Sequence, residues 1–140
     1  MDLADALAFA RAQRNGVLVT LRRDGRPQLS NILYDLGDDD VVRVSVTVDR
    51  AKTRNLARDP RASLYVSSPD FWSYVVLEGD AELGPQTTEP GDAGGLELRE
   101  VYRRIRGEEH PDWDDFDRAM VRERRLVVRL RPTRAYGLRR

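Results

Sequence analysis

Alternating apolar and polar residues joined by very short turns are the feature that most limits how this chain can fold. In the run 41–48, valine alternates with arginine, serine and threonine, the period of two that is typical of a half-buried strand. Upstream, Asp24-Gly25 separates two strand-like runs, 16–23 and 28–36, by a hairpin-length turn. Parallel strands need much longer crossovers, so these runs predict an antiparallel sheet.

The rest of the chain adds helices late and strands at the end. Apolar spacing and turn residues predict helices at 3–13 and 51–58, strands at 62–68 and 72–83, a Pro/Gly loop at 85–95, two helices around 98–105 and 113–120, and strands at 126–130 and 134–138, split by Pro132. This order predicts a mainly β fold, a small β-barrel with peripheral helices, in a single domain over 1–140.

Composition excludes several classes of function. Basic and acidic residues number 24 each, so a net charge of zero argues against a nucleic-acid binder that relies on a large positive field. The chain has no cysteine and one histidine, His110, which argues against thiolate, Ser-His-Asp or multi-histidine metal chemistry. It contains no membrane-length apolar run, no signal peptide and no Gly-rich nucleotide motif. We expect a cytoplasmic protein without a metal site or membrane contact.

One basic residue stands apart from the others. All but one of the 24 basic residues are arginines, and the one lysine is Lys52. It lies in the segment RAKTRN at 50–55. A GC-rich genome explains the arginine bias, but lysine is a compact point charge whereas arginine is a planar fork. The lysine at position 52 therefore has two interpretations. Either a point charge is required there, or this lysine is a chance exception to the arginine bias on a solvent-exposed helix.

The junction between the strand 41–48 and the helix 51–58 is the best candidate for a binding site. A helix start has unsatisfied N–H groups and a partial positive charge, and here it carries Arg50, Lys52 and Thr53. This combination predicts a phosphate site. The alternative is an ordinary helix, capped by Asp49, whose basic residues face water.

Neighbouring residues extend this candidate site. Ser45 is one of the small polar residues on the strand that leads into the junction. If the strands 28–36 and 41–48 pair as a hairpin, Asn31 lies near the same face.

Two further groups of residues remain open to more than one reading. Trp72 and Tyr74 alternate onto one face of the strand 72–83, where they could stack on a planar ring or belong to the core or a subunit interface. Arg122, Arg124 and Arg125 are expected at a helix C-terminus, where cations complement the helix dipole.

The order of several segments resembles a known family. Nearly the whole chain is covered by five segments: DGRPQLSN, VSVTVDRAKTRNLARDPRASLYV, WSYVVLEGDAEL, WDDFDRAMVRERR and YGL. Together they resemble the actinobacterial coenzyme F420-dependent branch of the pyridoxamine 5′-phosphate oxidase-like, split β-barrel proteins. RAKTRN followed by DPRAS is the most specific part.

The resemblance implies a homodimer of split β-barrels of the flavin reductase/pyridoxamine phosphate oxidase type, with cofactor sites at the interface. It implies that Arg50, Lys52 and Thr53 hold the phosphate of a deazaflavin, coenzyme F420. Ser45 and Val46 would line the ring or ribityl groove, with Asn31 nearby, and Trp72 and Tyr74 would come from the partner subunit.

The implied activity is hydride transfer from reduced F420 to a small conjugated organic acceptor, with no catalytic side chain assigned. An FMN-dependent oxidoreductase of the same fold is a second hypothesis, with FMN as the cofactor. A non-catalytic F420-binding or carrier protein is a third, and a purely structural dimer without a cofactor is a fourth. Pyridoxamine phosphate oxidation is not expected, because the pyridoxal-binding C-terminal pattern of those enzymes is not matched at Arg129-Leu130-Arg131-Pro132.

Overall fold

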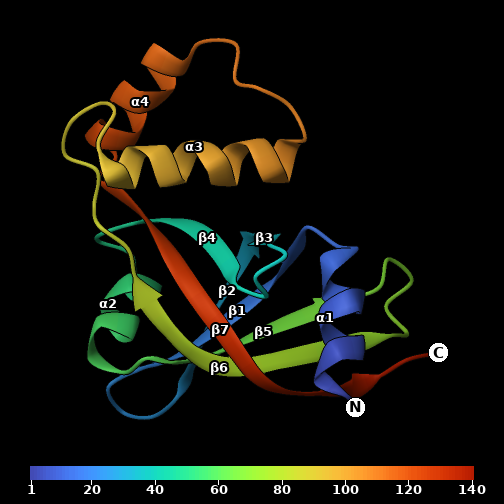
Figure 1. Cartoon of the computed structure of the whole chain (residues 1–140). Helices are drawn as coiled ribbons and strands as arrows, with labels where there is room; N and C mark the ends of the chain where they lie inside the picture. Colours follow the sequence, from blue (N-terminus) through green and yellow to red (C-terminus); the bar gives the residue numbers. More distant parts are fainter.

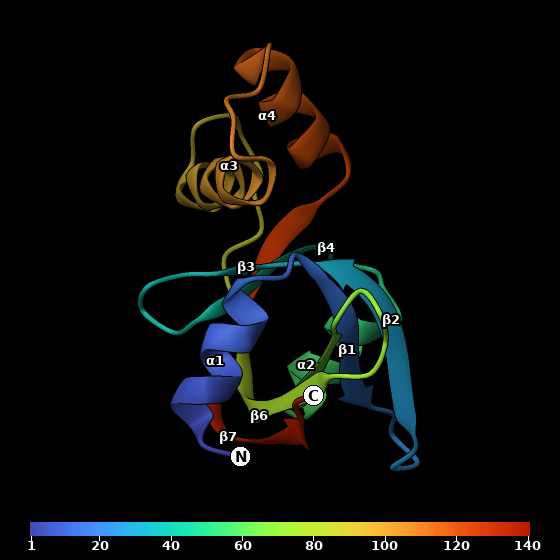
Figure 2. The same cartoon turned by 90° about the vertical axis from the view of Figure 1, so that its right-hand side faces the viewer.

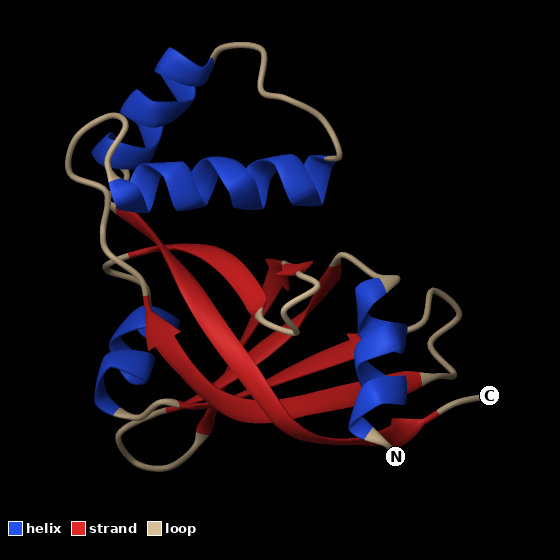
Figure 3. Ribbon diagram, in the orientation of Figure 1, coloured by secondary structure: helices blue, strands red, loops and turns tan.

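The computed structural model describes all 140 residues (Figure 1). Strands form the body of the molecule, and the helices lie around it (Figure 3). In chain order the elements are α1 (Leu3–Arg11), β1 (Asn15–Leu21), β2 (Pro27–Leu33), β3 (Asp35–Leu36), β4 (Val42–Thr47), α2 (Ala51–Arg58), β5 (Arg61–Ser67), β6 (Tyr74–Leu83), α3 (Ala93–Arg106), α4 (Trp113–Arg122) and β7 (Arg125–Leu138).

The seven strands form one antiparallel sheet in the order β2-β1-β5-β6-β7-β4-β3. The sheet curls so that the upper end of β2 comes close to β4 in Figure 2, and residues of both strands line one cavity. The two ends are not hydrogen-bonded to each other, so the barrel stays split. The predicted mainly β fold, a split β-barrel with peripheral helices, is confirmed.

The long strand β7 is continuous where the sequence predicted two strands. The prediction assumed that Pro132 interrupts pairing, because proline has no N–H to donate. In the structure Pro132 lies opposite Gly79, at a register shift in the β6–β7 ladder. Such irregularities tolerate proline. A Cβ on Gly79 would lie 2.1 Å from the carbonyl oxygen of Arg131, so only glycine allows this close approach.

The predicted strand 28–36 is wrong in its continuity and in its pairing. It breaks at Tyr34, whose buried hydroxyl donates to the carbonyl of Ala10 at 2.6 Å. Residues before the break pair only with β1, whereas Asp35 and Leu36 pair with β4. Only the end of the expected hairpin therefore exists, and β2 lies at the opposite end of the strand order from β4.

The core lies inside the curl and is closed by α1, which lies across its open side (Figure 2). Ala6, Leu7 and Ala10 are the buried face of this helix, as its apolar spacing predicts. The strands contribute mainly valine and leucine, and the side chains of Val42, Val44 and Val46 are almost fully buried. The alternation in 41–48 therefore marks the core face of β4.

The helix α2 has the predicted bounds but not the predicted cap. Its N-cap residue is Arg50, which makes no side-chain capping hydrogen bond, so the expectation for Asp49 was wrong. A buried amide holds the helix to the sheet instead. The Nδ2 of Asn55 donates to Thr20 Oγ1 at 3.1 Å, and that hydroxyl donates to Gln28 Oε1 at 3.1 Å.

The helices α3 and α4 form a hairpin with its own small core, built on Leu98, Val101 and Phe116. Arg99 on α3 joins Asp117 on α4 through a hydrogen bond of 2.9 Å. Arg129 on β7 holds Glu97 through two hydrogen bonds of 2.7 Å, which ties α3 to the sheet. The hairpin therefore lies over one side of the barrel (Figure 1). No helix in the structure combines the length and the hydropathy needed to cross a membrane.

The loop that leads into α3 is organised around one carboxylate. Asp92 is the N-cap and accepts from Thr87 Oγ1 and from the backbone N–H groups of Thr88, Glu89 and Gly95. Burial raises the pKa of Asp92, but these hydrogen bonds outweigh it and lower the pKa to about 2. The N–H of Thr87 also donates to the carbonyl of Arg125 at 3.0 Å.

Replacing Asn55 by alanine should destabilise the fold, because it removes a buried hydrogen bond between α2 and β1. We expect the free energy of unfolding to fall by about 1–3 kcal/mol, and the melting temperature to fall by several degrees. Thermal and urea unfolding measure both quantities. Asn15→Ala is the matched control, because the side chain of Asn15 is exposed and makes no hydrogen bond; an equal loss in both variants would contradict the assignment.

Asp92→Asn should change how stability depends on pH. The folded pKa lies below the ordinary value, so the ionised carboxylate stabilises the fold above about pH 4, and this contribution is lost as the pH falls through about 2. Near neutral pH the variant should unfold more easily, by about 1–2 kcal/mol. In urea titrations at about pH 7 and about pH 2.5, the difference from the parent protein should shrink at the lower pH. Asp38→Asn, at an exposed carboxylate that makes no hydrogen bond, is the matched control and should unfold like the parent protein at about pH 7.

Candidate functional site

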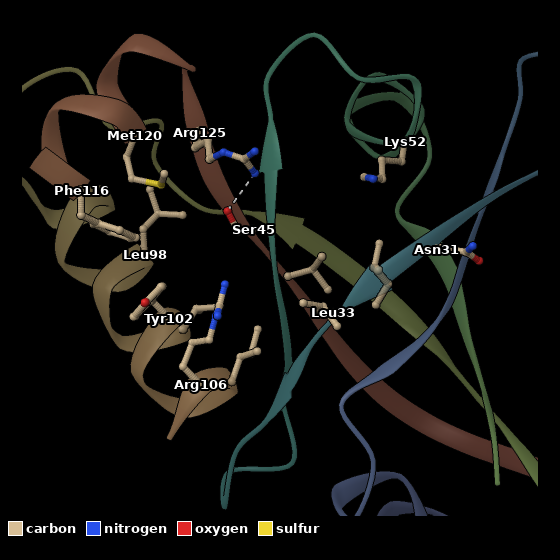
Figure 4. A pocket seen from close by; sticks show the side chains of 14 residues that line it. Asn31, Leu33, Ser45, Lys52, Leu98, Tyr102, Arg106, Phe116, Met120 and Arg125 are labelled. Carbon is tan, nitrogen blue, oxygen red and sulfur yellow. Dashed lines mark hydrogen bonds between the residues drawn. The ribbon is translucent and has the colours of Figure 1, made fainter. Parts of the chain in front are cut away.

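A cavity of about 450 Å³ lies between the split in the barrel and the α3–α4 hairpin. Figure 4 shows its walls, with β2, β4 and α2 on one side and the helical hairpin on the other. The lining comprises nine apolar side chains and five polar ones: Ile32, Leu33, Val44, Leu98, Val101, Tyr102, Ile105, Phe116 and Met120, with Asn31, Ser45, Lys52, Arg106 and Arg125. This volume lies in the range of cofactor and substrate pockets.

The charge of the lining is one-sided. Three cations, Lys52, Arg106 and Arg125, face the cavity and no carboxylate does, although acidic and basic residues are balanced over the whole chain. Lys52 is only 8% exposed and makes no hydrogen bond or ion pair with any side chain. Burial lowers the pKa of the Lys52 ammonium, and the charges of Arg50 and Arg125 lower it further. Such a group is stabilised by an anion.

The start of α2 adds backbone donors beside Lys52. The N–H groups of Ala51 and Lys52 have no hydrogen-bond partner, and no side chain caps this helix. Thr53 is buried, and its Oγ1 donates to the carbonyl of Thr47 at 2.7 Å, which holds the first turn of α2 against the end of β4. Free N–H groups next to a cation form an anion site of the kind found at helix starts.

Arg125 joins this group from a distant part of the chain. Its Nη1 donates to Ser45 Oγ at 3.2 Å (Figure 4), and its Nε donates to Glu123 at 2.8 Å. The sequence indicated a helix-terminal cation here, but α4 ends at Arg122, and Arg125 is the first residue of β7. The β4–β7 register brings Arg125 beside β4. No spacing in the sequence could have signalled this contact, because 80 residues separate Arg125 from Ser45.

The edge of β4 that faces the cavity is partly unpaired. β3 pairs only with Val42 and Arg43, so from Val44 to Thr47 the strand has a hydrogen-bonded neighbour on one edge only, in β7. The side chain of Val46 packs in the core, which leaves its backbone as the part that a ligand along this edge can reach. Free backbone donors and acceptors of this kind can pair with the polar rim of a planar ring.

The predicted site residues fall into three groups. Asn31, Ser45 and Lys52 line the cavity together. The curl of the sheet brings Asn31 there, because β2 does not pair with β4. Arg50, the N-cap residue, and Thr53, in the first turn of α2, flank Lys52 without lining the cavity, and the side chain of Val46 packs in the core. Trp72 and Tyr74 lie elsewhere.

Trp72 and Tyr74 belong to the outer surface of this chain. Trp72 is 65% exposed in the turn before β6, which begins at Tyr74 rather than at residue 72. Tyr74 is half-buried and stacks on Tyr65 with ring centroids 5.6 Å apart. Neither aromatic residue lines the cavity within this chain.

The helical wall of the cavity was not foreseen as part of a site. The apolar spacing at 98–105 predicted a helix without a role in a site, yet Leu98, Tyr102 and Ile105 on its apolar face line the cavity. Arg106 extends from α3 into the space between that helix and β4 (Figure 4). No residue of the loop 85–95 lines the cavity. A wall contributed by late helices is a tertiary feature that periodicity alone does not reveal.

Comparisons with known proteins agree with this architecture. The structure is similar to that of a conserved hypothetical protein, Rv2991, from Mycobacterium tuberculosis, with 25% identity and a TM-score of 0.74 over 98% of this chain and 84% of that one. It is similar to an F420 reductase, with 28% identity and a TM-score of 0.65 over 88% of this chain and 89% of that one. A FAD-binding protein from Mesorhizobium loti shares the fold, with 18% identity and a TM-score of 0.68 over 98% of this chain and 92% of that one.

The family model for pyridoxamine 5′-phosphate oxidase matches residues 4–139, which is almost the entire chain. The split barrel, with a cavity lined by three cations at its opening, agrees with this match. The chain therefore belongs to the pyridoxamine 5′-phosphate oxidase family.

Proposed function

We propose that this protein is an F420H2-dependent reductase that transfers hydride to a small conjugated organic acceptor. The observation that carries the proposal is Lys52, a buried cation without a carboxylate partner at the start of α2. Similarity to an F420 reductase at 28% identity supports the choice of cofactor. The cytoplasm, where reduced cofactors are regenerated, is the proposed location.

The residues present fit a phosphate-bearing deazaflavin. Lys52 and the free N–H groups of Ala51 and Lys52 would bind the phosphate, with Arg50 at the mouth of the site and Thr53 holding the helix start in place. The unpaired edge of β4, from Ser45 to Val46, would face the ring, and Asn31 would lie across the cavity from it. When bound, the reduced ring supplies the hydride.

The chain contributes binding, orientation and exclusion of water. Leu98, Phe116 and Met120 form an apolar wall opposite β4, which shields a reacting pair from solvent. No carboxylate or histidine faces the cavity, so water is the proposed source of the proton that completes the reduction. Holding donor and acceptor in contact can itself supply much of the acceleration.

We further propose that the protein is a homodimer joined through the outer face of the sheet. Leu29, Leu33, Tyr136 and Leu138 are exposed on that face. The paired positions Leu29–Val19, Asn31–Val17, Val17–Tyr65, Tyr65–Val76 and Val76–Tyr136 extend it across five strands. A contiguous apolar surface of this kind is typical of a subunit interface.

A rigid turn presents two aromatic side chains next to this face. Phe71 has a φ of +76°, which is strained for an aromatic residue, and it precedes the exposed Trp72. Asp70 accepts from the N–H of Trp72 at 3.1 Å, and Ser68 Oγ accepts from the N–H of Ser73 at 3.0 Å. Pre-ordered aromatic residues lose little entropy on association. We assign Trp72 and Tyr74 to the partner's cofactor site.

Lys52→Met should separate binding from stability. Losing one charge-assisted phosphate contact should weaken F420 binding by about 10- to 100-fold. The melting temperature of the unliganded protein should stay the same or rise, because an unpaired buried charge is removed. Fluorescence titration with F420 measures the first quantity and thermal unfolding the second.

Arg54→Met on the same helix is the matched control, because Arg54 is exposed and outside the cavity. Its affinity for F420 should match that of the parent protein. A parallel titration with FMN decides between the two cofactors: tighter FMN binding would identify an FMN-dependent oxidoreductase. Tight F420 binding without turnover of any conjugated acceptor would instead identify a carrier. Unchanged F420 affinity in Lys52→Met would contradict the assigned phosphate site.

Leu29→Arg should disrupt the proposed dimer. Leu29 is 59% exposed in the centre of β2, and an arginine there would place two charges in the apolar interface. Sedimentation velocity should show the parent protein at twice the chain mass of 16.0 kDa and the variant at the monomer mass. Leu96→Arg on α3, at a leucine of similar exposure (54%), should leave the dimer intact. A monomeric parent protein would refute the interface.

A further inference from the structure

The cavity is lined by three cationic side chains, more than the one phosphate of the proposed cofactor needs. Lys52 and the start of α2 account for one phosphate. Arg125 already has a carboxylate partner in Glu123. Arg106 makes no ion pair, and the lining offers it no carboxylate. One positive charge facing the cavity is therefore left without a counterpart.

Arg106 is placed at the other side of the cavity from Lys52. It lies in the last turn of α3, and the guanidinium carbon lies 5.5 Å from the centre of the Tyr102 ring. Figure 4 shows its nitrogen atoms between α3 and β4, with Lys52 on the far side of β4. A guanidinium held over an aromatic face keeps its outer N–H groups free for a second partner. A helix-end dipole explains a cation here, but not its direction into the cavity.

The surroundings of Arg106 define the rest of the ligand. Ile105 and Tyr102 lie beside it on α3, and Leu33 faces them from β2. These side chains offer apolar contact and one aromatic face and carry no second charge. They suit a flat, largely apolar body with a single anionic group at one end. A fork of N–H donors matches a planar carboxylate in particular.

We propose that the hydride acceptor is a planar, largely apolar molecule that carries a carboxylate, and that Arg106 binds this carboxylate and determines specificity. The inference rests on the proposed reductase function. In the reaction, reduced F420 is oxidised as it gives up a hydride. The conjugated system of the acceptor gains that hydride, and a proton from water completes its two-electron reduction. The carboxylate is not altered and serves only to orient the acceptor.

The test compares two acceptors that differ only in charge, anthraquinone-2-carboxylate and its methyl ester. Arg106→Gln should lower kcat/KM for the carboxylate by about 10- to 100-fold, the effect of one lost charge-assisted contact. It should change kcat/KM for the ester by less than about twofold, and leave the F420 affinity measured by fluorescence unchanged. Arg122→Gln, an exposed arginine on α4 outside the cavity, should change none of these quantities.

Two results would overturn the proposal. An equal loss of kcat/KM for acid and ester would show that Arg106 does not recognise the carboxylate. A loss of F420 affinity would show that Arg106 binds the cofactor instead. If neither acceptor is turned over, equilibrium dialysis of the carboxylate against both proteins, with and without oxidised F420, still decides the point. Weaker binding to Arg106→Gln would support the anion site while the reductase function fails, and equal binding would refute the site.

Discussion

The strand β7 pairs with a different neighbour along each edge, and the remaining architecture follows from that pairing. Residues 128–130 are hydrogen-bonded partners of β4 on one edge and of β6 on the other. The ladder to β6 continues through a register shift at Gly79, where the two backbones approach closely. Such irregularities increase local twist. The resulting curl buries the valine face of β4 and brings the upper end of β2 close to β4, which creates the opening that the cavity occupies.

The α3–α4 hairpin lies over this opening because the chain leaves and re-enters the sheet at neighbouring points. The N–H of Gly84 donates to the carbonyl of Val127, and the N–H of Thr87 donates to that of Arg125. Its internal core and the Arg99–Asp117 pair hold its two helices together, whereas ion pairs to Arg129 hold it to the sheet. The core of the hairpin also includes Val127 of β7, so the hairpin packs on the sheet and forms one wall of the cavity.

Opposite charges are distributed unequally between surface and cavity. Over the surface, arginines and carboxylates pair repeatedly, as in Arg43–Asp39 and Arg61–Asp59, which contributes little to stability. Within the cavity, Lys52 and Arg106 have no carboxylate partner. A buried unpaired ammonium destabilises the unliganded fold, and the proposed phosphate at the start of α2 would offset this cost. Arg106 is exposed and carries no such cost, so its proposed role rests on its place in the cavity lining and on its lack of an ion pair.

Local chemistry in the sequence determined most of the elements and one end of the site. The Asp24-Gly25 turn, the valine alternation of β4 and the bounds of α2 were predicted because each depends on neighbouring residues. The lone lysine, which the sequence singled out, lines the cavity. The break at Tyr34 and the continuity of β7 through Pro132 were mispredicted, since a backbone carbonyl on α1 and a glycine on β6 decide them from afar. Only the curl of the sheet and the return of the chain from α4 place Arg125, Arg106 and the helical wall in the same cavity as Lys52. Sequence periodicity reports which face of an element is apolar, whereas the tertiary structure decides what that face encloses.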